Sequence, residues 1–262
     1  MHPTINSEEQ HAIAQRVAVV GAGRVGRALA VALAESRLAV EGPLGRAQAP
    51  APCDAVLLCV PDAEIGRAAE WAAGRAPLVG HTSGATPLAA LEPAARAGAE
   101  LFGLHPLQSF AHGAGPAAFA GAGCAVAGST PAAIEFAASI ARRLGMSPFE
   151  IDDEGRAAYH AAASVASNFL VTLQAAAESI AAGAGLAPEE ARALLVPLLR
   201  RTVDNLAELG PDGALTGPIA RGDHATVEAQ RAAVEDVAPH LLDLFDELAH
   251  HTRALARPEV RA

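Results

Sequence analysis

Three glycines near the start of the chain form the clearest chemical pattern in the sequence. Gly21, Gly23 and Gly26 are spaced Gly-x-Gly-x-x-Gly, after the apolar run 17–20 and before the helix-forming run 27–35. In this pattern the first glycine permits a tight turn, the second lets the backbone approach a diphosphate, and the third lets a helix pack on a strand. The helix start also offers N–H groups to an anion. The context favours a dinucleotide site over a glycine-rich turn without a ligand.

Polar residues follow three later runs that are typical of strands. Val60-Pro61-Asp62, His81-Thr82-Ser83 and His105 each come after such a run. Parallel strands present their carboxyl ends at one edge of a sheet, so we expect these residues to meet there, near a nicotinamide ring. Either histidine could instead be a loop residue bonded to the backbone. The predicted cofactor-binding residues are Gly21, Ala22, Gly23, Arg24, Val25, Gly26, Arg46, Val60, Pro61, Asp62, Thr82 and Ser83, and His105 is a candidate catalytic residue.

Two residues compete to select the cofactor. Glu41 lies about twenty residues past the first glycine, where an acid bonds the ribose 2′-hydroxyl of NAD. Gly42-Pro43 follows it, so Glu41 could end inside a strand and leave Arg46 over the adenosine ribose. An arginine there accommodates the 2′-phosphate of NADP. We therefore expect NADP, with NAD as the alternative and a solvated loop arginine as the non-binding interpretation of Arg46.

A polar stripe marks the second half of the chain. His160, Ser164 and Asn168 are spaced i, i+4 and i+8 among alanines, which places them on one face of a helix. One interpretation is a substrate face, with the histidine as proton donor and the other two as hydrogen-bonding groups. The other is a buried helix whose polar groups bond within the core or to a partner subunit.

The elements that must position these groups alternate through the first part of the chain. Strands are expected at 16–20, 38–41, 54–60, 77–80, 100–104 and, as the last one, 123–128, and helices at 24–36, 63–73 and 131–144. This alternation predicts an α/β fold with a doubly wound, Rossmann-type parallel sheet. Later helices are expected at 153–183, 188–209, from 226 and at 239–255, with a kink at Pro197. We expect a dinucleotide-binding domain at 1–150 and an all-helical substrate and dimerisation domain at 151–262.

Composition excludes several function classes. The 262 residues carry 19 Lys+Arg, all of them arginine, against 29 Asp+Glu, for a net charge of −10. An acidic chain without a basic run does not suit nucleic acid or an anionic membrane. No apolar run is long enough to span a bilayer, and residues 1–15 lack the order of a signal peptide. Cys53, Cys59 and Cys124 are few and scattered, so we expect a cytoplasmic protein without disulfides or a metal site.

Together these motifs resemble a bacterial family in which a Rossmann-like first domain precedes a helical domain of unknown function. The resemblance covers nearly the whole chain. It rests on Gly21-x-Gly23-x-x-Gly26, Val60-Pro61-Asp62, His81-Thr82-Ser83-Gly84-Ala85, Gly103-Leu104-His105-Pro106, Tyr159-His160-Ala161-Ala162-Ala163, Ser167-Asn168-Phe169-Leu170-Val171 and Leu215-Thr216-Gly217-Pro218-Ile219-Ala220-Arg221-Gly222-Asp223. The family is similar to ketopantoate, pyrroline-carboxylate and β-hydroxyacid reductases, with a helical domain like the C-terminal domain of 6-phosphogluconate dehydrogenase.

The resemblance implies an NAD(P)H-dependent reductase of a small 2-oxo acid. Ketopantoate, in pantothenate biosynthesis, is the best single substrate, and an imine or a β-hydroxyacid is the alternative. The better-known enzymes use a lysine on the long helix as general acid, and this chain has no lysine. His160 is predicted to donate the proton instead, with Ser164 and Asn168 orienting the substrate. The residues that match the family's connector and are predicted to bind the substrate carboxylate are Arg221, Asp223 and Thr226.

A protein of another class, a nucleotide-binding sensor or partner that catalyses nothing, stays open. It would be favoured if His105 and His160 both pointed into the helical core. The alanine-rich helices need partners, and related reductases often pair through this domain. We therefore expect a homodimer through residues 151–262.

Overall fold

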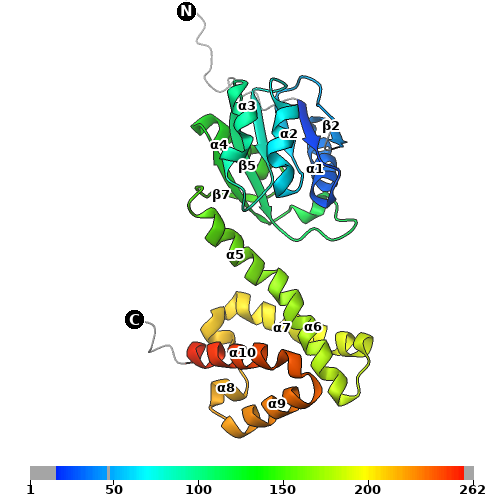
Figure 1. The fold of residues 1–262 in the computed structure, drawn as a ribbon, viewed down its shortest axis with the longest axis vertical. Helices are drawn as coiled ribbons and strands as arrows, with labels where there is room; N and C mark the ends of the chain where they lie inside the picture. Colours follow the sequence, from blue (N-terminus) through cyan, green and yellow to red (C-terminus); the bar gives the residue numbers. More distant parts are fainter. Residues whose placement is uncertain (1–15, 46–47, 257–262) are drawn as a thin grey trace, which may run out of the picture. The chain divides into compact units, whose positions relative to one another are not determined.

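The structure, a computed structural model, describes residues 16–45 and 48–256, which form two compact units. The first unit ends at Ser164 and the second begins at Val165. The first contains a sheet with helices on both faces, and the second is entirely helical in its described part (Figure 1). The division falls inside a helix that starts at Arg156, beyond the domain boundary expected at residue 150.

One seven-stranded sheet organises the first unit. Its strand order is β2-β1-β3-β4-β5-β6-β7. The strands are β1 (Arg16–Val20), β2 (Ala39–Leu44), β3 (Ala55–Leu58), β4 (Leu78–His81), β5 (Glu100–Leu107), β6 (Gly123–Gly128) and β7 (Ser147–Glu150). All neighbouring pairs are parallel except β5 and β6. The predicted Rossmann-type α/β fold is confirmed, with one antiparallel pair that the alternation of elements did not reveal.

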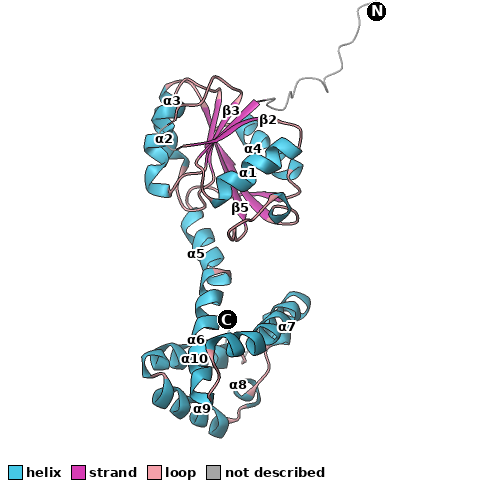
Figure 2. Cartoon of the chain, turned by 90° about the vertical axis from the view of Figure 1, so that its right-hand side faces the viewer, coloured by secondary structure: helices cyan, strands magenta, loops and turns pink. Residues whose placement is uncertain are grey.

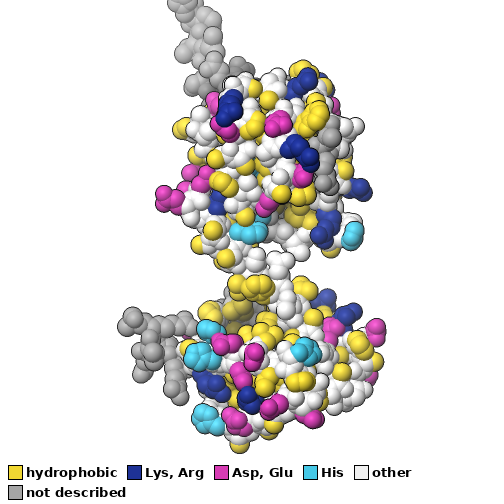
Figure 3. Space-filling view, in the orientation of Figure 1, with side chains coloured by type: hydrophobic (Ala, Val, Ile, Leu, Met, Phe, Trp, Pro, Cys, Tyr) yellow, Lys and Arg dark blue, Asp and Glu magenta, His cyan; other side chains and the backbone are white. Residues whose placement is uncertain are grey.

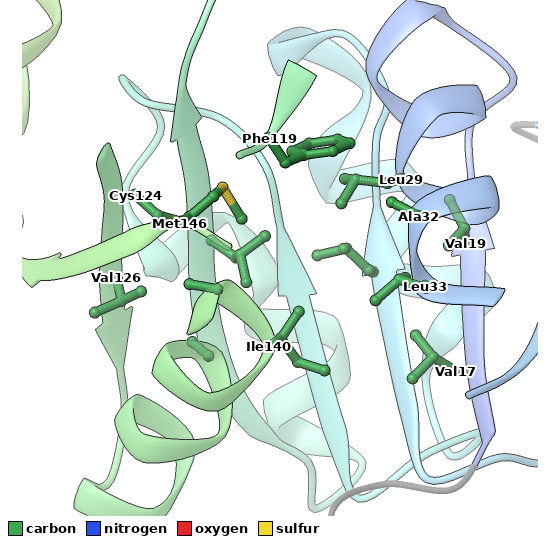
Figure 4. Close-up of a cluster of buried hydrophobic side chains, with 14 of the residues drawn as sticks. Val17, Val19, Leu29, Ala32, Leu33, Phe119, Cys124, Val126, Ile140 and Met146 are labelled. Atoms are coloured by element: carbon green, nitrogen blue, oxygen red, sulfur yellow. The ribbon is translucent and has the colours of Figure 1, made fainter. Parts of the chain in front are cut away.

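Helices cover both faces of this sheet. They are α1 (Arg24–Glu35), α2 (Ile65–Ala72), α3 (Glu92–Arg96) and α4 (Pro131–Arg143), with the 3₁₀ turns η1 (Asp62–Glu64), η2 (Leu88–Leu91) and η3 (Pro116–Ala118). Figure 2 shows α1 and α4 on one face and α2 and α3 on the other. The buried strand residues therefore divide into two apolar clusters, one on each face. Leu29 and Leu33 of α1 meet Ile140 of α4 and Phe119 over the first face (Figure 4).

The register of the parallel strands brings several chain segments to one edge. Val20 of β1 lies beside Leu58 of β3, Leu58 lies beside His81 of β4, and His81 lies beside Gly103 of β5. The residues that follow these positions therefore emerge in a row along the carboxyl edge. This edge receives the glycine turn, Val60 to Asp62, the segment after His81, and His105.

The edge strand β7 was missed in the sequence, where 123–128 was expected to be the last strand. Ser147–Glu150 is short, contains a proline and is mostly exposed. Such a strand lacks the apolar run that marks the buried strands, because it pairs on one side only and tolerates proline there. β7 pairs with β6, which itself pairs antiparallel with β5, and these pairings are tertiary features that local sequence does not show.

The helices of the C-terminal half differ from the expected set at two places. They are α5 (Arg156–Ala166), α6 (Asn168–Ala181), α7 (Pro188–Ala214), α8 (Pro218–Arg221), α9 (His224–Val237) and α10 (Leu242–Leu255), with the 3₁₀ turns η4 (Ala182–Ala184) and η5 (Pro239–Leu241). The single helix expected at 153–183 breaks at Ser167, whose φ of −121° and ψ of −68° are not helical. In α7 the non-helical residue is Gly210, with φ +68°, and not Pro197. Glycine adopts this angle without steric strain, so the helix changes direction there.

The second unit buries few side chains. Its fully buried hydrophobic residues, within the described part of the chain, are Ala191, Val227, Val234, Ala238 and Ala249. Large apolar side chains of α6 and α7 are exposed instead, and Figure 3 shows hydrophobic atoms at the surface among charged ones. No helix in the described ranges is both long and apolar enough to cross a membrane.

Candidate functional site

Two glycines of the turn between β1 and α1 are fixed by packing. Gly21 has φ +114°, and a Cβ atom there would lie 2.2 Å from the carbonyl oxygen of Cys59. A Cβ atom on Gly26 would lie 1.9 Å from the carbonyl oxygen of Gly21. Neither position accepts a side chain without movement of the backbone. These two glycines therefore hold the turn against the end of β3.

The middle glycine has open space around it. A Cβ atom on Gly23 would meet nothing within 4 Å, and the φ of −72° and ψ of −175° suit any residue. Gly23 is the N-cap of α1, which no side chain caps and whose first turn contains no acid. Ala22 and Arg24 beside it are exposed, and Arg27 Nε donates to the Ala22 carbonyl at 2.7 Å. Val25 is half-buried. This geometry fits a diphosphate at the start of α1.

The turn lies where the strand order reverses. β2 lies on one side of β1 and β3 on the other, so the connections from β1 and β3 run in opposite directions. In open α/β sheets the crevice beyond such a switch point is where ligands bind. Val60 is half-buried beside Gly21, and Pro61 and Asp62 are exposed along the same edge.

Glu41 lies inside β2 and is already paired. Its carboxylate accepts hydrogen bonds from Arg16 at 3.3 Å and from the backbone N–H of Ala51 at 3.2 Å. The strand continues to Leu44, whose carbonyl accepts the Gly21 N–H at 2.8 Å. Glu41 is therefore not at the strand end, where a ribose contact would need it. Arg46, the alternative, lies outside the described residues.

Ser83 and Thr82 make hydrogen bonds that shape the segment after β4. The Ser83 hydroxyl accepts from the Ala85 and Thr86 N–H groups at 3.2 and 2.9 Å and bonds the Thr86 hydroxyl at 3.0 Å. Thr82 N–H donates to the Leu58 carbonyl at 3.1 Å. Since the Ser83 side chain is buried in this loop, any cofactor contact from it would come from the backbone.

His81 is fully buried at the end of β4. Its Nδ1 accepts the Ser83 N–H at 3.2 Å, which assigns the ring proton to Nε2. Among the described residues no group meets full hydrogen-bond geometry at Nε2, although the backbone of Pro87 is close enough to raise the pKa of the ring. Burial lowers the pKa of His81 to about 4, and the nearby Arg156 adds to the effect while Asp62 opposes it. His81 is thus a neutral imidazole at physiological pH.

His105 and Tyr159 form a hydrogen-bonded pair. His105 Nδ1 lies 2.7 Å from the Tyr159 hydroxyl, and the two rings meet edge to face with centroids 5.5 Å apart. The imidazole of His105 lies where a side chain on Gly84 would project, since a Cβ atom on Gly84 would lie 2.7 Å from Cε1 of His105. His160 directly follows Tyr159 in α5 and is exposed. Its ring centroid lies 6.1 Å from that of His105.

Arg156 places a buried cation beside these rings. It is 4% exposed, and its Nε donates to Asp153 at 2.6 Å. A Cβ atom on Gly103 would lie 3.1 Å from its Nη2, so the guanidinium crosses β5 where that glycine leaves room. Burial, and then His160 and Arg156, lowers the pKa of His105 to about 4. Burial raises the pKa of Tyr159 to about 12. Both members of the pair are neutral between those values.

The predicted stripe on α5 does not continue along one helix. Ser164 is half-buried four residues after His160 on α5, but Asn168 begins α6 in the second unit. The break at Ser167 ends the i, i+4, i+8 relation on which the stripe depends. The structure thus groups His160 with His105 and Tyr159, and the role of Asn168, a residue of the second unit, stays a prediction.

The connector residues of the second unit form a helix cap. Asp223 accepts the Thr226 N–H at 3.1 Å and the Thr226 hydroxyl at 2.6 Å, which caps the start of α9. These bonds lower the pKa of Asp223. Arg221 is exposed at the end of α8. The role of Arg221, Asp223 and Thr226 in binding a carboxylate stays a prediction, and two of them have this structural role already.

Two of the residues around His105, Arg156 and Tyr159, were not recognised as site residues in the sequence. Arg156 carried no motif, because only the side-chain contact between its guanidinium and Gly103 of β5 brings it to the edge. Tyr159 belonged to a family motif without an assigned role. It is the single tyrosine of the chain, directly before His160, and that rarity was the available signal. Within the described residues, no group of three or more His, Cys, Asp or Glu is placed to hold a metal ion.

The sheet order, the glycine turn at its switch point and the helical C-terminal region define a Rossmann-type two-unit protein. Residues 122–252, half of the chain, match DUF2520, a domain of unknown function, and the chain belongs to that family. Comparison with the curated proteins found no match.

Solved structures share the fold over almost the whole chain. The Bacteroides fragilis protein BF3122, provisionally described as an NADP oxidoreductase, is 20% identical with a TM-score of 0.76, over 92% of this chain and 98% of that one. Protein TM1727 from Thermotoga maritima is 26% identical with a TM-score of 0.73, over 94% and 100%. Pyrroline carboxylate reductase from Plasmodium falciparum, solved with NADP bound, is 12% identical with a TM-score of 0.59, over 92% and 98%.

Proposed function

We propose that the protein is an NADP-dependent reductase of a small 2-oxo acid, with ketopantoate as substrate and pantoate as product. The glycine turn carries this proposal, because two of its glycines are fixed by packing while Gly23 is open where a diphosphate would lie. The residues that would hold the cofactor are the backbone of 21–26 and the row Val60, Pro61, Asp62, Thr82 and Ser83. A bound NADPH would supply the hydride, and the protein supplies orientation and charge.

The preference for NADP over NAD is supported by β2. Glu41 is bonded to Arg16 and Ala51 inside the strand, so it is not available to a ribose 2′-hydroxyl at the strand end. Arg46 follows the strand closely in the sequence and is the residue we propose for the 2′-phosphate. The similar structures from Bacteroides fragilis and Plasmodium falciparum are described with NADP, which agrees with this choice.

Reduction of a carbonyl is supported by the groups around His105. His105, a neutral imidazole that is hydrogen-bonded to Tyr159 and has its own N–H to donate, lies beside the buried cation Arg156. A carbonyl oxygen gains negative charge during reduction, and fixed donors and cations stabilise such charge. The alternative substrate class is an imine, as in the pyrroline carboxylate reductase of similar fold. An imine needs less acid assistance, which would suit a chain without lysine.

The test is a titration followed by a substrate panel. NADPH and NADH are titrated into the purified full-length protein, and oxidation of the bound reduced cofactor is then followed with ketopantoate, other small 2-oxo acids and cyclic imines. We expect tighter binding of NADPH and oxidation with ketopantoate. Absence of affinity for both nucleotides would overturn the proposal, and oxidation with cyclic imines alone would transfer it to the imine class.

A non-catalytic nucleotide sensor makes a different prediction in the same experiment. It would bind NADPH but oxidise it with no member of the panel. His105 and His160 both belong to the first unit, at the edge that also carries the glycine turn, and this position favours the enzyme.

A further inference from the structure

We infer that His105 donates the proton in this reduction and that Tyr159 acts through it, by replacing the proton on the opposite ring nitrogen. The inference rests on the proposed reductase function and assigns the donor that the sequence placed at His160. Its basis is the hydrogen bond between the Tyr159 hydroxyl and His105 Nδ1, which fixes one imidazole at the carboxyl edge of the sheet.

The packing around His105 fixes the orientation of its ring. One face covers the α-carbon of Gly84, where no side chain could fit, and the edge contacts Tyr159. A proton donor held in this way needs little reorganisation during the reaction. His160, in contrast, is exposed.

The direction of the hydrogen bond follows from the chemistry of the two groups. A phenol oxygen is a much weaker base than an imidazole nitrogen, so the hydroxyl donates and Nδ1 accepts. The ring proton of His105 is then on Nε2. The charged and titratable groups that face His105 are Arg156 and His160 of α5 and Asp62 of η1. The two groups of α5 and burial together keep the ring neutral.

The proton given to the product comes from solvent water by way of Tyr159 and His105. As the carbonyl carbon of the substrate gains a hydride, the carbonyl oxygen takes the proton from Nε2 of His105. Nδ1 takes the proton from the Tyr159 hydroxyl, so the imidazole stays neutral throughout. The resulting phenolate at Tyr159 is then reprotonated by water, which restores the pair.

The first experiment measures the pair without any cofactor. Because Tyr159 is the single tyrosine, the near-ultraviolet absorbance of phenolate reports on it alone. Nitrogen-15 spectra of the histidines, with His105→Gln to assign the signals, give the tautomer of His105. We expect an unprotonated Nδ1 that accepts a hydrogen bond in the wild type and loses this bond in Tyr159→Phe. A proton on Nδ1 in the wild type would overturn the inference.

The second experiment measures single-turnover reduction of ketopantoate, or of the best substrate in the panel. We expect Tyr159→Phe to bind NADPH normally and to react about a hundredfold more slowly at neutral pH. The variant should then recover about tenfold for each pH unit of acidification, because protonated His105 donates without needing tyrosine. The wild-type rate should stay nearly constant over the same range.

Phe149→Leu is the matched control, since it removes a ring contact of Tyr159 and leaves the hydroxyl. It should keep the wild-type rate and the flat pH profile. Three results would each overturn the inference while leaving the reductase proposal standing. They are a wild-type rate in Tyr159→Phe, a lower rate in Tyr159→Phe that acid does not restore, and a lower rate in His160→Ala alone. If the wild type oxidises NADPH with no substrate, both proposals fall together.

Discussion

The buried histidines show how single residues tie this site to the stability of the fold. His81 and His105 are both held neutral by burial beside Arg156, with pKa values of about 4. In an unfolded chain each would titrate near pH 6.5. The fold therefore becomes less stable in acid, because the unfolded state binds protons at these two histidines that the folded state does not bind.

This linkage predicts the pH range in which the first unit weakens. For a histidine with a lowered folded pKa, the contribution to stability is complete above about pH 6.5 and is lost as the pH falls toward about 4. With about 1.4 kcal/mol per pKa unit, the unfolding free energy should fall by roughly 2–5 kcal/mol across this window. Urea unfolding followed by circular dichroism between pH 7 and pH 4.5 measures it.

His105→Gln supplies the comparison for that measurement. It removes one of the two titrating imidazoles and should make the fall in unfolding free energy distinctly shallower. A wild-type stability that is unchanged down to pH 4.5 would show that these histidines are not held neutral by the fold.

At the scale of the element, the glycines of the turn between β1 and α1 have different structural reasons. Gly21 and Gly26 are required because the backbone of the turn and of β3 leaves no room for a Cβ atom. Gly23 has room for one, so no described residue packed around it requires glycine there. The pattern Gly-x-Gly-x-x-Gly therefore contains two positions that packing explains and one that the proposed diphosphate would explain.

Gly23→Ala should therefore weaken cofactor binding without weakening the fold. We expect at least a tenfold loss of NADPH affinity by titration, with an unchanged thermal midpoint, because the methyl group occupies the approach of the diphosphate. Gly115→Ala is the matched control, since a Cβ atom there also meets nothing within 4 Å, and it should change neither property. Gly26→Ala should instead lower the thermal midpoint markedly. Normal NADPH binding by Gly23→Ala would contradict the assignment of the turn.

At the scale of the whole molecule, the helical unit exposes large apolar side chains on two of its helices. Leu194, Leu198, Leu206 and Leu209 lie along α7 at helical spacing, and Leu198 is 64% exposed. On α6, Val171 is 70% exposed. Exposed apolar surface of this kind often marks a protein interface. We propose that a second copy of the chain covers it, which gives a homodimer through the helical unit.

Leu198→Glu tests this proposal. The added charge would have to be buried in the interface, so we expect a shift from dimer to monomer in light scattering coupled to size-exclusion chromatography. Arg200→Glu, an exposed change on the other side of the same helix, should leave the dimer intact. A wild-type protein that is monomeric at all accessible concentrations would contradict the proposed dimer.

By itself, the sequence determined the features that depend on local pattern. The apolar run 17–20 and the glycines after it predicted β1, the turn and α1, because strand length, turn chemistry and helix propensity all agree there. The buried strands β3 and β5 and the helix α4 were also predicted, and the change to helices in the C-terminal half was confirmed. The family followed from motifs that are local in the same sense.

Only the tertiary structure decided which polar groups meet. Strand register aligned His81 with Gly103, and two side chains of α5 reach β5, Arg156 beside Gly103 and Tyr159 at His105. The break at Ser167 ended the helical spacing that joined Asn168 to His160, and Asp223 and Thr226 form a helix cap. The grouping around His105 depends on contacts between segments far apart in the chain, which helical spacing and strand alternation do not encode. The break at Ser167 and the cap between Asp223 and Thr226 are local, and only the backbone angles and side-chain orientation in the structure revealed them.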